Sequence, residues 1–98
     1  MTRDVIVRPE AEQDLRDAHA WYRKIAPVLG EQFISAVDQA ITSASDNPLA
    51  FQALHRSLRR VLLRHFPYAF FFAAEESRIA VLGVLHQARN PRVAQRQR

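Results

Sequence analysis

The spacing of the apolar residues changes halfway along the chain, and this change is the strongest constraint on the fold. Up to about residue 46, apolar side chains recur every three or four positions, as on one face of an α-helix. From residue 58 onwards, the chain instead has short aliphatic and aromatic runs separated by polar turns, a pattern typical of β-strands. The sequence therefore predicts a helical first half and a sheet built largely from the second half.

Prolines mark the boundaries of the first elements. Residues 4–8 are short and rich in β-branched side chains, which indicates a strand that stops at Pro9. Pro9 suits the first turn of a helix predicted over 9–25, which has acidic residues at its start and basic ones at its end. Pro27 and Gly30 are expected to break the chain, and a second apolar stripe then runs from Phe33 and ends before 46–48. The two helices should form an antiparallel hairpin.

Three further strands are predicted, over 58–64, 68–73 and 79–85. The last is an uninterrupted apolar run, as expected of a strand that is covered on both faces. The resulting order is β-α-α-β-β-β, an α+β fold with the helical hairpin on one face of a small, mostly antiparallel sheet. The other face, or one end of the sheet, would receive partners. We expect residues 1–91 to form one domain and 92–98 a basic, flexible tail.

Charge is distributed unevenly between the two halves of the chain. Residues 1–49 carry five basic and eight acidic side chains, a balance of −3, whereas residues 50–98 carry nine arginines and two glutamates, a balance of +7. Arginine pairs well with phosphate and carboxylate groups, so we expect an anionic partner for the second half. The alternative is that arginine merely reflects a GC-rich genome, although its clustering favours the first interpretation.

Several classes of protein are disfavoured by composition. The chain has no cysteine, which rules out disulfides and thiolate metal sites, and its four histidines have no partner at metal-ligand spacing. We therefore expect no metal site. No apolar run approaches the ~20 residues that span a bilayer, so a cytoplasmic protein without a membrane partner is predicted.

Several short segments follow one another in a specific order. They are Ala11-x-x-Asp14-Leu15 with Trp21-Tyr22, then Leu58-Arg59-Arg60, Phe66-Pro67-Tyr68 and His86-x-x-Arg89-Asn90. Together with the element order, they resemble the RelE/ParE toxin superfamily over about residues 5–91, in particular its ParE-like, plasmid-stabilisation branch. The resemblance implies the toxin of a type II toxin-antitoxin system, in a hetero-oligomer with an acidic antitoxin that folds on binding. Operator DNA would be contacted only through that antitoxin.

The resemblance leaves three functions open. ParE-like members inhibit DNA gyrase by direct binding, without a cofactor. RelE-like members are ribosome-dependent mRNA endonucleases that use Lys and Arg at the phosphate and a C-terminal Tyr or His near the 2′-hydroxyl. Here no Tyr follows Arg89, and no Lys lies between the second helix and the next strand, so gyrase inhibition is favoured. The third alternative is a non-toxic member kept for partner binding or autoregulation.

The candidate site residues come from the basic half. For target binding they are Arg60, Arg64, Arg89 and Arg92; for the alternative nuclease they are Arg60, Arg64, His86 and Arg89. Four positions apart on one strand, Arg60 and Arg64 should share a face, while either Arg59 or Arg60 would pair with a helix carboxylate. The alternatives are solvated arginines and a hydrogen-bonded strand-end histidine. Trp21, Tyr22 and 70–72 are expected in the core.

Overall fold

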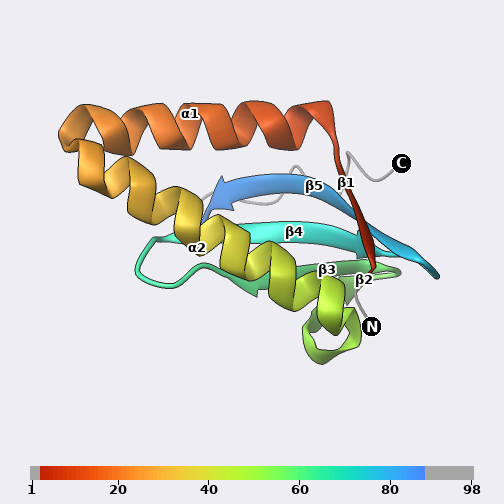
Figure 1. Cartoon of the computed structure of the whole chain (residues 1–98). Coiled ribbons are helices and arrows are strands. Elements are labelled where there is room, and N and C mark those ends of the chain that lie inside the picture. Colours follow the sequence, from red (N-terminus) through yellow and green to blue (C-terminus); the bar gives the residue numbers. More distant parts are fainter. Residues whose placement is uncertain (1–2, 88–98) are drawn as a thin grey trace.

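The computed structural model describes residues 3–87, which form two helices and a five-stranded sheet (Figure 1). The elements are β1 (Asp4–Val7), α1 (Pro9–Ile25), α2 (Pro27–Asp46), the short 3-10 helix η1 (Pro48–Ala50), β2 (Gln52–His55), β3 (Leu58–Leu62), β4 (Tyr68–Ala74) and β5 (Arg78–His86). The strand order is β1-β5-β4-β3-β2, and only the pairing of β1 with β5 is parallel. The predicted α+β fold with a mostly antiparallel sheet is confirmed.

Two details of the predicted strands are wrong. The structure has an additional edge strand, β2, whose four side chains are all exposed, so it has no burial pattern that the sequence could reveal. Strand β3 ends at Leu62 instead of residue 64. Its neighbour in the chain, Leu63, still donates its N–H to the carbonyl oxygen of Tyr68 at 3.0 Å, but His65 then adopts a left-handed conformation (φ 67°) that turns the backbone.

The helical hairpin is set by a proline break and a close crossing. Ala26, between the helices, is extended, and Pro27 begins the second helix because it needs no hydrogen bond for its nitrogen. The expected break at Gly30 is wrong, because this residue lies inside α2. A Cβ at Gly30 would lie 3.1 Å from the Cβ of Arg23 and 3.2 Å from the His19 ring. The missing side chain of Gly30 therefore lets the two helices approach each other closely before they diverge (Figure 1).

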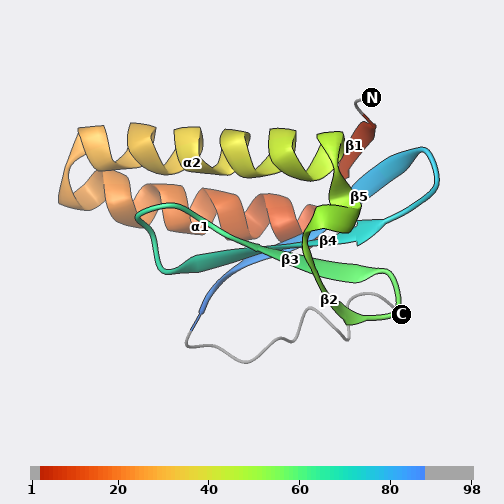
Figure 2. The ribbon, with the colours of Figure 1, turned by 90° about the horizontal axis from the view of Figure 1, so that it is seen from below.

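The main core lies between the hairpin and the sheet. Phe33 from α2, Phe70 and Phe72 from β4, and Ile79 and Val81 from β5 are fully buried there. Burial of this kind contributes roughly 2 kcal/mol for each large apolar side chain. The hairpin is thereby fixed to one face of the sheet, as Figures 1 and 2 show.

The opposite face of the sheet is also apolar. Its buried cluster consists of Leu58, Ala69, Phe71, Ala73, Ala80 and Leu82, each at most 8% exposed. Both described helices lie on the other face (Figure 2). Because these side chains are buried, they present little apolar surface to solvent. The exposed side chains on it lie at the rims, notably Leu54 and Leu62.

None of the helices within residues 3–87 combines the length and apolarity needed to cross a bilayer.

Candidate functional site

Arg60 and Arg59 lie side by side on β3 but have different surroundings. Arg60 shares the face of Leu58, opposite the helices, and donates from Nη2 to Oε1 of Gln52 on β2 at 2.5 Å. Arg59 faces the other way and donates from Nη1 to the carbonyl oxygen of Phe51 at 2.8 Å. The predicted pairing with a helix carboxylate is therefore wrong. Arg59 anchors the start of β2, whereas the half-buried Arg60 presents its charge beside β2.

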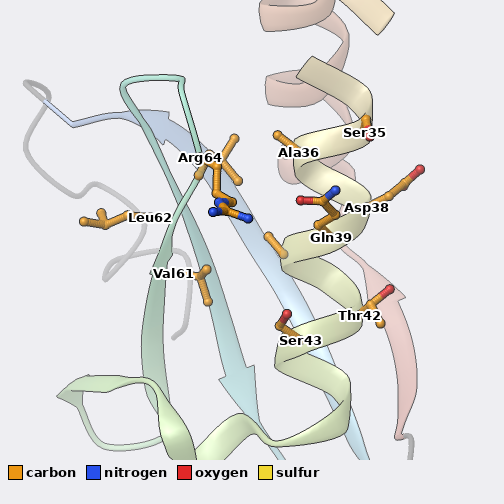
Figure 3. Close-up of a pocket in the computed structure, with 11 residues that line it drawn as sticks. Ser35, Ala36, Asp38, Gln39, Thr42, Ser43, Val61, Leu62 and Arg64 are labelled. Carbon is orange, nitrogen blue, oxygen red and sulfur yellow. The ribbon is translucent and has the colours of Figure 1, made fainter. Parts of the chain in front are cut away.

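Arg64 lies beyond the end of β3, in a groove between that strand and α2. The groove has a volume of 530 Å³, and Figure 3 shows the guanidinium of Arg64 pointing toward α2. A second pocket of 450 Å³ adjoins it and shares Ser35, Ala36, Gln39 and Arg64. One wall is polar, from serine, threonine and glutamine side chains of α2 and from Asp38, whose carboxylate points away from Arg64 in Figure 3, while Val61 and Leu63 are buried apolar side chains of the other wall.

The prediction that Arg60 and Arg64 share one strand face is thus wrong. Strict alternation of side chains holds only within a strand, and β3 ends at Leu62. The two guanidinium groups consequently flank the end of β3 from different sides: Arg60 beside β2, and Arg64 in the groove against α2.

His86 lies elsewhere, at the end of β5. Its ring meets that of Tyr68 edge-on, with centroids 5.5 Å apart. It lines a pocket of 220 Å³ between α1 and β5, together with Asp14, Asp17 and Trp21. The nuclease candidates therefore lie apart: Arg64 lines the two pockets against α2, His86 lines the pocket between α1 and β5, and Arg60 lies beside β2. Arg89 and Arg92 lie outside the described residues.

Sequence reasoning missed the exposed aromatic of this pocket. Trp21 was expected in the core, but its exposed fraction is 62%, and Ile25, one helical turn later, is 60% exposed. A signal was available, because Asp14, Asp17 and Trp21 are spaced at i, i+3 and i+7 and so share one helical face. Tyr22, one position later, turns into the core as predicted and stacks on Phe33.

Within residues 3–87, no group of three or more His, Asp or Glu side chains could hold a metal ion.

Comparisons with known proteins agree on one family. The family described as "ParE toxin of type II toxin-antitoxin system, parDE" matches residues 5–91. Toxin ParE2 of Mycobacterium tuberculosis is 34% identical over 95 residues, which cover 93% of this chain and 88% of the relative. A chain in the solved structure "Chromosomal ParDE TA system from P. aeruginosa" has the same fold, with a TM-score of 0.73 at 12% identity, covering 87% of this chain and 96% of that one. Together with the two-helix, five-stranded architecture, these matches show that the chain belongs to the ParE toxin family of type II toxin-antitoxin systems.

Proposed function

We propose that this toxin acts by binding DNA gyrase, and that its antitoxin neutralises it by covering the same basic surface. As a ParE toxin, the chain has an antitoxin partner. The observation that carries the proposal is the separation of three side chains: Arg60 lies beside β2, Arg64 in the groove against α2, and His86 in the pocket between α1 and β5. Cleavage of a phosphodiester would require such groups around one phosphate, whereas protein binding needs only a charged, concave surface.

The basic surface at the end of β3 has features that suit an acidic protein partner. Arg64 lies in a groove with a polar wall from α2 and an apolar wall from Val61 and Leu63, while Arg60 and the exposed Leu62 extend the surface onto the far side of the strand. Arginine at the edge of an apolar groove is typical of protein interfaces. We infer that acidic segments of the target and of the antitoxin compete for this surface.

Gyrase binding can be distinguished from mRNA cleavage directly. We expect the purified chain to inhibit supercoiling by gyrase, and its expression in cells to induce the DNA-damage response while translated mRNA stays intact. A supercoiling assay and primer extension on mRNA are the two measurements. Ribosome-dependent cleavage that disappears in His86→Ala would instead establish the endonuclease. If the chain binds the antitoxin but neither inhibits supercoiling nor causes mRNA cleavage, it is a non-toxic member of the family.

Arg60 and Arg64 should contribute to target binding without contributing to folding. We expect Arg60→Ala and Arg64→Ala each to weaken gyrase inhibition by about 2- to 5-fold, less at high salt, since an exposed ion pair is worth at most about 1 kcal/mol. Their melting temperatures should stay within a few degrees of the wild type. The inhibition constant and thermal denaturation measure the two effects separately.

Two other arginines provide matched controls. Arg16→Ala removes an exposed arginine from α1, whose Nη1 lies 3.7 Å from Glu12, and should leave inhibition unchanged. Arg59→Ala should mainly lower stability, because it removes the hydrogen bond to Phe51. If Arg60→Ala and Arg64→Ala behave like Arg59→Ala, both arginines are structural and the proposed binding surface is wrong.

A further inference from the structure

The pocket between α1 and the end of β5 combines an exposed indole with two carboxylates. Trp21 lies on its rim, and Asp14, Asp17, Tyr68 and His86 also line its 220 Å³. A tryptophan that exposes 62% of its surface gains little from folding, although this residue type is strongly enriched at binding hot spots. Its position beside a cavity therefore points to a binding role.

The carboxylates are held in place on the same helical face as the indole. Asp14 accepts the N–H of Val84 through Oδ2 at 3.1 Å, and Asp17 accepts from Nε2 of Gln13 through Oδ1 at 2.7 Å. An ionised carboxylate can accept about four hydrogen bonds, so the exposed Asp17 retains acceptor capacity toward the pocket. Arg16, on the next face of α1, contacts Glu12 and Gln13 and does not line the pocket.

An aromatic ring beside a carboxylate suits one chemical group particularly well. A guanidinium can stack on the indole face while its planar N–H fork binds the carboxylate, and arginine does both better than lysine. We propose that this pocket binds an arginine side chain of a partner protein, with the guanidinium between the Trp21 ring and the Asp17 carboxylate. The volume of the pocket is suitable for one side chain of that size.

The neighbouring surface favours a protein as the source of this arginine. Ile25 follows Trp21 by one helical turn, and the exposed Val28 lies in the first turn of α2, so the apolar surface continues to the tip of the hairpin. A segment with apolar residues next to its arginine could cover both. The partner segment would be basic, opposite in charge to a segment that binds Arg60 and Arg64, so the pocket is independent of the proposed gyrase surface.

The single tryptophan makes the pocket measurable, because all indole fluorescence of the chain comes from Trp21. The full chain is titrated with an acetylated, amidated Leu-Arg-Leu peptide and with its neutral citrulline counterpart. We expect saturable binding of the arginine peptide near millimolar Kd, and binding at least about 5-fold weaker for citrulline, as the loss of one charged contact of roughly 1 kcal/mol implies. Asp17→Asn should weaken binding of the arginine peptide by a similar factor. Glu76→Gln, which changes an exposed carboxylate in the turn between β4 and β5, should not.

Four outcomes would overturn parts of this assignment. Equal binding of the arginine and citrulline peptides, or unchanged binding in Asp17→Asn, would show that no guanidinium is recognised. A lysine peptide that binds as tightly as the arginine peptide would show a general cation site. If arginine amide alone binds as tightly as the peptide, the apolar residues at the hairpin tip contribute nothing to binding. The inference that the arginine belongs to a protein segment would then be wrong. Because the readout does not involve gyrase, these results stand whether or not gyrase is the target.

Discussion

Phe33→Ala is expected to lower the free energy of unfolding by about 4 kcal/mol, as large-to-small changes of core aromatics do. Phe33 is fully buried, and its ring contacts three others: it stacks on Tyr22 at 5.4 Å and meets Phe66 and Tyr68 edge-on at 5.4 and 5.5 Å. The cluster joins both helices to the turn between β3 and β4. Its loss should therefore loosen the hairpin from the sheet. Urea denaturation followed by circular dichroism measures the change.

Two control variants test whether the loss of stability comes from this aromatic cluster and not from the removal of any apolar side chain. Leu49→Ala removes a mostly exposed side chain and should cost less than about 0.5 kcal/mol. Phe33→Leu keeps most of the volume and should cost roughly half as much as Phe33→Ala. A loss below about 2 kcal/mol for Phe33→Ala would contradict the role given to the cluster.

The same cluster gives stability a dependence on high pH. Burial raises the pKa of the Tyr22 phenol above its usual value of 10.0, and the nearby Tyr68 raises it further. The folded chain thus holds this proton more tightly than the unfolded chain does. The stabilisation is fully present below pH 10 and is lost as the pH rises from there through the folded-state pKa of Tyr22.

The helices and central strands were predictable because burial imposes a period on them. Both helices were placed within a few residues of their observed bounds, since prolines begin them and the apolar stripes define their faces. Strand β2 could not be found in this way, because it is stabilised by backbone pairing with β3 while its side chains stay in solvent. An exposed edge strand has no hydrophobic pattern.

The candidate site was predicted less well, for reasons that concern single residues. The positive φ of His65 and the early end of β3 decide where Arg64 points, and neither follows from residue types, since a positive φ is uncommon in any residue other than glycine. Trp21 was assigned to the core together with the other aromatic residues, Tyr22 and 70–72. Its helical spacing relative to Asp14 and Asp17 was the better guide, since it places all three on the face beside β5.

Asp14 provides a hydrogen-bond acceptor for the part of β5 that does not pair with β1. Strand β1 pairs with β5 only from Arg78 to Val81, so within residues 3–87 no strand pairs with the remainder of that edge. Val84 is buried there, and its N–H donates to Oδ2 of Asp14 at 3.1 Å across 70 positions of sequence. A buried amide without such a partner costs about 1–3 kcal/mol. The Asp14 carboxylate on α1 therefore satisfies a buried amide at this edge of the sheet and links α1 to β5.

Asp14→Ala should accordingly lower the free energy of unfolding by about 2 kcal/mol, whereas Asp14→Asn, which keeps an acceptor oxygen, should cost roughly half of that. Asp17→Ala, on the same helical face, should cost less than about 0.5 kcal/mol because its side chain is exposed. Hydrogen exchange gives the local readout: the Val84 amide should exchange much faster in Asp14→Ala, while amides between β3 and β4 change only with global stability. Unchanged exchange at Val84 would contradict the role of Asp14. An unprotected strand edge also invites pairing with other chains, so we expect sedimentation velocity to show self-association of Asp14→Ala at concentrations where Asp14→Asn stays monodisperse.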